Sequence, residues 1–223
     1  MEIIPVLDLK GGSVVHAKQG ERDTYRPISS GLAATSAPRD VLAGLLRLHP
    51  FKTIYIADLD AIEAKGGHSS LIAELADIHP QLEFWVDSGN ATSFDRASIH
   101  HVVGSESMPQ TENLPTIAPM AILSLDFRGE NFVGPPALLE QPALWPERII
   151  VMTLARVGSG DGPDLERLAS IRQRAPARRV YAAGGVRGRD DLEALRNAGA
   201  AGILVASALH DGRLTPTDLA AFG

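Results

Sequence analysis

The chain alternates between short apolar runs and longer segments whose apolar residues recur at helical spacing. The first run opens with five consecutive apolar residues at 3–7, a pattern typical of a strand buried on both faces. The apolar runs predict strands at 3–9, 53–57, 82–86, 101–103, 119–125, 148–152, 179–183 and 202–205. The amphipathic segments predict helices at 37–48, 69–79, 92–98, 135–144, 163–174, 189–197 and 216–221.

Eight strands that alternate with helices indicate an α/β protein with a parallel sheet. A closed (β/α)8 TIM barrel, formed as one domain over residues 1–223, is the most economical arrangement of that many strands. An open doubly wound sheet is the alternative. It usually has fewer strands, and no G-x-G-x-x-G motif follows the first strand here.

The two halves of the chain resemble each other. Asp8 ends the first predicted strand and Asp126 the fifth, and a glycine lies three residues after each. Small residues follow the third and fourth strands, and again the seventh and eighth. The pattern predicts two (βα)4 half-barrels, at about 1–117 and 118–223, although any eightfold barrel repeats weakly with itself.

Asp8 and Asp126 are the candidate catalytic residues. The carboxyl ends of the strands carry the chemistry of α/β barrels, so the two side chains are expected to face each other across the mouth. Two carboxylates in different environments can divide the roles of acid and base. The alternative is that each caps a turn or pairs with Lys10 or Arg128.

Two further polar residues end predicted strands. Asp58, after the second strand, is interpreted as a positioning residue. Thr153, its counterpart on the sixth strand, could donate a hydrogen bond to a ligand or have no role.

Small residues after four strands predict phosphate binding, because loop N–H groups free of bulky side chains can converge on an anion. Such turns are also rich in glycine for purely geometric reasons. The loops after strands seven and eight are the usual phosphate site of this fold. The candidate residues are Gly89, Asn90, Gly104 and Ser105 in the first half, and Gly184, Gly185, Ala206 and Ser207 in the second. Each of these two sets of residues is a predicted phosphate cradle. One cradle in each half implies a ligand with phosphates at both ends.

The polar loop at 18–27, which follows a short predicted β segment at 13–17, is a candidate substrate loop. Arg22, Tyr25 and Arg26 could close over an anionic ligand through two guanidinium groups and a phenol. A solvated run of charges is the equal alternative.

Composition narrows the function classes. The 27 acidic and 21 basic residues give a net charge of −6, which disfavours non-specific binding to nucleic acid. The lack of cysteine excludes disulfides and thiolate chemistry, and the seven histidines show no metal-ligand spacing. No apolar run is long enough to cross a membrane, and no targeting segment precedes the first strand, so a cytoplasmic protein is expected.

Several segments together resemble the barrel family of histidine biosynthesis, which holds the ribotide aldose–ketose isomerase and the cyclase subunit of imidazole glycerol phosphate synthase. The matching segments are 3–12, 14–20, 57–61, 103–105, 124–126 and 183–186. Leu9 and the Gln-Gly pair at 19–20 are closer to the isomerase pattern. The resemblance implies a barrel of two half-barrels, a substrate with two phosphates and an Amadori rearrangement. It also implies Asp8 as general base, Asp126 as general acid, Thr153 as an assisting hydroxyl, and neither metal nor organic cofactor.

Three loops depart from the isomerase pattern. The isomerases carry Gly-Gly-Gly-Ile-Arg after the third strand, where residues 87–91 read Asp-Ser-Gly-Asn-Ala. The change removes two glycines and the arginine and places a carboxylate near an expected phosphate. Residues 156–159 replace an Asp-Gly pair, and Ala206 stands where a glycine is usual. The acid–base pair is retained while the ligand envelope changes.

Three functions therefore remain open. The first is the histidine-pathway isomerase or a close variant of it. The second is a related acid–base enzyme on a different phosphorylated substrate, with one-carbon cofactor biosynthesis as a candidate setting. The third is a non-catalytic barrel that binds a phosphate ligand. For all three functions we expect a phosphorylated small molecule as the partner, and neither nucleic acid nor a membrane. The sequence leaves the oligomeric state open.

Overall fold

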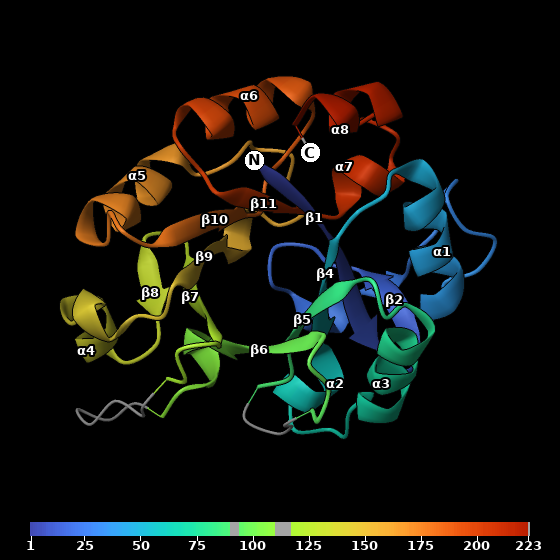
Figure 1. Ribbon diagram of the computed structural model, residues 1–223, viewed down its shortest axis with the longest axis horizontal. Coiled ribbons are helices and arrows are strands. Elements are labelled where there is room, and N and C mark those ends of the chain that lie inside the picture. Colours follow the sequence, from blue (N-terminus) through green and yellow to red (C-terminus); the bar gives the residue numbers. More distant parts are fainter. Residues whose placement is uncertain (90–93, 110–116, 223) are drawn as a thin grey trace.

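The computed structural model describes residues 1–89, 94–109 and 117–222, and within them eight parallel strands close into a barrel (Figure 1). The barrel closes because β11 pairs with β1, which also pairs with β4. The barrel strands are β1 (Glu2–Lys10), β4 (Thr53–Asp58), β5 (Glu83–Asp87), β6 (Ile99–Gly104), β7 (Ile122–Arg128), β9 (Arg148–Thr153), β10 (Arg179–Ala183) and β11 (Gly202–Val205). The predicted (β/α)8 TIM barrel is confirmed.

Helices surround the strand ring on its outer side (Figure 1). The α-helices are α1 (Pro38–Leu48), α2 (Leu59–Ile62), α3 (Ser69–Ile78), α4 (Pro136–Glu140), α5 (Leu165–Arg174), α6 (Arg189–Asn197), α7 (Ser207–His210) and α8 (Pro216–Phe222). Single 3-10 turns are η1 (Arg22–Thr24), η2 (Ser105–Ser107), η3 (Pro142–Leu144) and η4 (Leu154–Arg156). The chain ends lie close together, with the Met1 ammonium donating to the Phe222 carbonyl at 3.2 Å.

Local sequence explains most helix boundaries and three departures from prediction. The helix predicted at 163–174 begins at Leu165, because the Asp164 carboxylate caps α5 by accepting a hydrogen bond from the Arg167 N–H at 3.1 Å. The helix predicted at 135–144 is interrupted at Gln141 by Pro142, which has no N–H to continue it. The helix predicted at 92–98 is wrong in its described part, since 94–98 contains no helix. Residues 92–93 lie outside the described residues.

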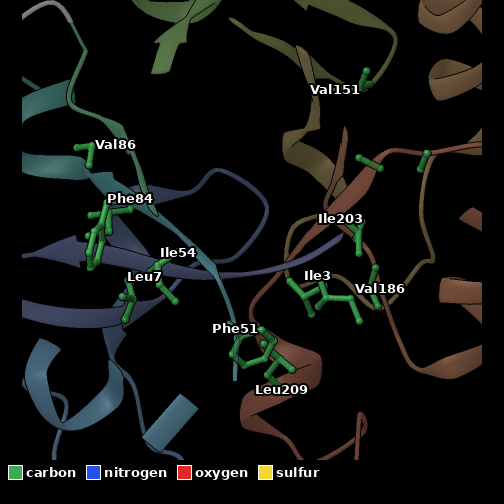
Figure 2. Packing of buried hydrophobic residues seen from close by; sticks show 14 of the residues in the cluster. Ile3, Leu7, Phe51, Ile54, Phe84, Val86, Val151, Val186, Ile203 and Leu209 are labelled. Carbon is green, nitrogen blue, oxygen red and sulfur yellow. The ribbon is translucent and has the colours of Figure 1, made fainter. Parts of the chain in front are cut away.

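Alternation along the strands divides the core into two layers. Outward-facing side chains, among them Ile54, Phe84 and Ile203, pack against the helices (Figure 2). Inward-facing ones fill the barrel, where Trp85 and Tyr181 meet edge to face with centroids 4.9 Å apart. The filled interior forms a solid floor beneath the mouth, so ligand chemistry is confined to the open end above it.

Two hairpins extend β1 and β7 beyond the ring. Strand β2 (Ser13–His16) pairs antiparallel with β1 and with β3 (Arg26–Pro27), and β8 (Asn131–Val133) pairs antiparallel with β7. Strand β7 begins and ends three residues later than the predicted strand, so Asp126 lies inside it. Asp8 and Asp126 each stand two residues before the end of their strand. The derivation of the barrel from two duplicated halves stays a prediction.

Barrel closure depends on a position with no room for a side chain. A Cβ at Gly202 would lie 2.6 Å from Tyr181 Cδ1 and 2.8 Å from the Glu2 carbonyl oxygen. We expect Gly202→Ala to destabilise the fold by about 1–3 kcal/mol through overpacking. Thermal unfolding followed by circular dichroism measures this. Gly31→Ala is the control, because its Cβ would meet nothing within 4 Å, and an equal melting temperature for both variants would contradict the prediction.

Candidate active site

A cavity opens at the carboxyl ends of the barrel strands, above the Trp85–Tyr181 floor. Four carboxylates line it, from Asp8, Asp87, Glu106 and Asp126. They come from β1, β5, η2 and β7, so the closed ring brings together residues that are up to 118 positions apart in the chain. Small residues from the loops after β10 and β11 line it as well.

Asp8 is half-buried on the cavity wall. Burial raises the pKa of its carboxyl to about 7, and the Arg22 guanidinium opposes the rise. A carboxyl group with a pKa near neutrality can hold or release a proton at physiological pH, which suits a general base.

Asp126 is more deeply buried and rigidly held. Its Oδ1 accepts a hydrogen bond from Ser124 Oγ at 2.7 Å. Its Oδ2 accepts from Ser105 Oγ and from the Glu106 N–H, both at 3.0 Å. Burial raises its pKa to about 7 against these hydrogen bonds. One carboxyl of the Asp8–Asp126 pair can therefore be protonated while the other is ionised.

Asp87 adds a third carboxylate beside this pair and is itself buried. Burial raises its pKa to about 6, while the Gly89 N–H, donating to Oδ1 at 3.0 Å, works against the rise. The Tyr55 hydroxyl lies 3.5 Å from Oδ2. Burial raises the pKa of Tyr55 well above its usual value, and the surrounding carboxylates raise it further. Tyr55 is thus a neutral hydrogen-bond donor at the cavity floor.

The candidate substrate loop reaches the cavity with two of its three residues. The Arg22 side chain lines the cavity and forms an ion pair with Glu106, which lies after β6. Tyr25 lines it too, and burial raises its pKa to about 12 with help from Asp8. Arg26 is exposed and donates to the Tyr25 carbonyl at 3.0 Å, away from the cavity lining.

The second-half cradle lines the cavity with Gly184, Gly185, Ala206 and Ser207. Here two loops approach so closely that a Cβ at Gly185 would lie 2.2 Å from the Gly162 carbonyl oxygen. Arg213 lines the same region, held by Asp211 at 2.8 Å. Small residues beside a cation are the features expected of a phosphate site.

The first-half cradle is arranged differently. Gly89, Gly104 and Ser105 are buried and do not line the cavity. A Cβ at Gly104 would lie 3.1 Å from Asp87 Oδ2 and 3.5 Å from Asp126 Oδ2, so this glycine makes room for carboxylates. Ser105 Oγ contacts Asp126 and the Val133 carbonyl. Asn90 lies outside the described residues.

The other two predicted residues lie away from the cavity lining. Thr153 is buried at the end of β9, where its neighbour Met152 faces the cavity instead. Asp58 caps α2 through the Ala61 N–H at 3.3 Å and accepts from His68 Nδ1 at 2.8 Å. The other ring nitrogen of His68 accepts from the Gly12 N–H at 2.9 Å. Asp58 thereby ties the β1–β2 turn to the loop after β4.

Among the polar side chains that line the cavity, sequence reasoning left five out of the candidate set: Tyr55, Asp87, Glu106, Arg128 and Arg213. Asp87 carries the signal that identified Asp8, a carboxylate ending an apolar strand, and could have been found in the same way. Tyr55 lies in the middle of a strand, where the sequence pattern indicates a residue of the hydrophobic core. Within the described residues, no group of three histidine or acidic side chains is placed to hold a metal ion, and no helix is long and apolar enough to span a membrane.

Comparison with known proteins gives consistent similarities. The family model described as "Histidine biosynthesis protein" matches residues 141–215. An uncharacterized protein of Methanocaldococcus jannaschii is 32% identical over 221 residues, covering 96% of this chain and 95% of its own length. Phosphoribosyl isomerase A of Streptomyces coelicolor is 28% identical, covering 94% and 93%. A Haloquadratum walsbyi isomerase, named for an imidazole-4-carboxamide with phosphoribosyl and phosphoribosylamino groups, is 29% identical, covering 97% and 94%.

The raised pKa of Asp8 has a consequence for stability. An aspartate in the unfolded chain ionises near 3.8, whereas Asp8 in the fold ionises near 7. The folded protein therefore holds an extra proton between these pH values, and its unfolding free energy falls as the pH rises through that window. We expect Asp8→Asn to melt higher than the wild type at pH 8, by about 2–4 °C for each kcal/mol relieved, and to melt equally at pH 4. Calorimetry at both pH values measures this, and a lower melting temperature at pH 8 would contradict it.

The close approach at Gly185 predicts how the glycine cradle responds to a methyl group. Gly185 has a φ of +87° and no space for Cβ, whereas Gly212 has a φ of +68° and open space around it. Gly185→Ala should lower the affinity for inorganic phosphate at least tenfold, because the loops must separate. Gly212→Ala should carry only the backbone strain of about 1–2 kcal/mol and keep phosphate affinity. Titration calorimetry separates the two, and unchanged affinity in Gly185→Ala would rule out this phosphate site.

Proposed function

This chain belongs to the histidine-biosynthesis barrel family, and on that premise we propose that it is an aldose–ketose isomerase of a phosphorylated substrate. The proposal is carried by one observation: Asp8 and Asp126 line the same cavity, each with a pKa near 7. The relatives named as isomerases support the reaction class. The glycine cradle in the same cavity supports a phosphorylated ligand.

The first step needs an acid. Asp126, in its protonated form, donates to the ring oxygen of an aminoaldose, and the bond between this oxygen and C1 breaks. The nitrogen lone pair forms a C1=N double bond, which leaves an open-chain iminium ion. Rigid hydrogen bonding from Ser105 and Ser124 orients the Asp126 carboxyl for this transfer.

The second step needs a base. Asp8, in its ionised form, takes the proton from C2, and the electron pair of that C–H bond forms an enolamine. Proton return from Asp8 to C1 and loss of the O2 proton to Asp126 give the ketose. The substrate gains protons at C1 and the ring oxygen and loses them from C2 and O2, so the reaction balances and both carboxyls return to their starting states.

A non-catalytic phosphate binder accounts less well for this cavity. Burying ionisable carboxylates without a full set of partners costs stability, and a binder of anions gains nothing from four acidic groups on its wall. An acid–base enzyme uses the same environment, because burial brings the pKa of each carboxyl to the working pH.

The test uses N-phenyl-5-phosphoribosylamine, formed from ribose 5-phosphate and aniline, in deuterated water. The wild type should produce the ketose with deuterium at C1, detected by proton NMR, with a bell-shaped pH profile centred near 7. Asp8→Asn and Asp126→Asn should each lower kcat at least 100-fold, because each lacks one proton-transfer group. Asp190→Asn, an exposed change of the same type, is the control and should leave kcat unchanged.

Retained turnover in either active-site variant would refute the assigned roles. If the folded wild type gives neither ketose nor deuterium incorporation while it binds the phosphoribosylamine, the barrel is a binder and the isomerase proposal falls.

A further inference from the structure

The two ends of the cavity differ in charge. The end formed by the loops after β10 and β11 carries small residues and Arg213. The end formed after β5 and β6 carries Asp87 and Glu106, and Arg128, at the end of β7, lies between the two ends in the strand order. A ligand that spans the cavity therefore meets a site suited to an anion at one end and a carboxylate wall at the other.

Two backbone donors among the described residues at the carboxylate end are already used by the protein. The Gly89 N–H donates to Asp87 at 3.0 Å. The Glu106 N–H donates to Asp126, also at 3.0 Å. A phosphate bound to these two N–H groups would have to displace the protein carboxylates that they hold.

Arg22, which lines the carboxylate end, is committed in the same way. Arg22 forms its ion pair with Glu106 across the mouth, and its guanidinium also lies near Asp8. The Arg22 guanidinium thus faces several carboxylates. A second phosphate would add two negative charges in a partly buried region where like charges repel more strongly than in water.

Asp87 retains the capacity to accept a further hydrogen bond. It is 6% exposed, and the described donor nearest to Oδ2 is the Tyr55 hydroxyl at a long 3.5 Å. A buried carboxylate with an incomplete set of donors is stabilised by any N–H group that reaches it. The same atom lies close to Gly104, which has no side chain to cover it, and Asp87 lines the cavity.

We propose that the substrate carries a phosphate at one end only, and that its other end carries a hydrogen-bond-donating, cationic nitrogen group received by Asp87 and Glu106. The proposal rests on the isomerase function and deepens it by naming the substrate class. It separates this chain from relatives such as the Haloquadratum walsbyi isomerase, which is named for a substrate with a phosphoribosyl and a phosphoribosylamino group.

The test uses three ligands that share one phosphate and differ at the far end. Reductive amination of ribose 5-phosphate with 4-aminobenzamidine, aniline or 4-aminophenyl phosphate gives open-chain N-aryl ribitylamine phosphates. Their far ends are an amidinium, a hydrogen atom and a second phosphate. None of them can be isomerised, so their affinities for the wild-type protein report recognition without turnover.

Titration calorimetry at pH 7.5 should rank the amidinium ligand at least tenfold tighter than the phenyl ligand. The two-phosphate ligand should bind at least tenfold more weakly than the phenyl ligand. Asp87→Asn should reduce the amidinium preference and leave the phenyl ligand unchanged. Glu106→Gln should raise the affinity for the two-phosphate ligand more than for the other two ligands, because it releases Arg22 from its ion pair. Asp190→Asn, far from these contacts, is the control for the loss of one charge and should keep the ranking.

Equal affinities, or a two-phosphate ligand that binds tightest to the wild type, would overturn the proposal. A wild-type ranking that Asp87→Asn and Glu106→Gln leave unchanged would overturn it as well. These outcomes are independent of the isomerase assay: a protein that isomerises the phenyl compound but prefers two phosphates refutes the substrate class alone. One that ranks the ligands as expected but shows no turnover refutes the isomerase function alone.

Discussion

The pairing of β11 with β1 is the constraint on which the rest of the structure depends. It places Ile3 opposite Ile203 and Pro5 opposite Val205, and so closes the strand ring. Closure gives every strand an inner and an outer face. The large inward-facing aromatic side chains therefore form the floor, and the inward-facing residues at the strand ends line the mouth. It also sets Asp8, at the end of β1, against the cradle that follows β11. An open sheet would leave these groups on opposite edges.

Above that floor, carboxylates and anion-binding groups compete for the same small space. The protein separates them: donors around β5, β6 and β7 hold Asp87 and Asp126, while the glycine cradle and Arg213 occupy the side of β10 and β11. The Arg22–Glu106 ion pair joins the loop after β2 to the far wall of the mouth. This division gives the cavity a direction along which a ligand can be oriented.

The same crowding links stability to chemistry. Burial moves the pKa values of Asp8 and Asp126 to about 7, which makes both groups useful near neutral pH and makes their ionised forms unfavourable in the fold. Hydrogen bonds from Ser105 and Ser124 limit that penalty at Asp126. Hydrophobic packing between the barrel and its helices offsets the free-energy cost of burying these carboxylates.

The amino-acid sequence by itself determined the eight strands, most of the helices and the pair of strand-end aspartates, because hydrophobic periodicity and strand-end position are local properties. The same local reasoning placed a helix at 94–98 where none forms, since a short apolar pattern does not show whether a segment has a partner to pack against. Only the tertiary structure decided that Gly104 and Ser105 serve carboxylates instead of facing a ligand, and that Arg22 meets Glu106. These outcomes depend on contacts between strands far apart in the chain, and barrel closure alone brings them within reach.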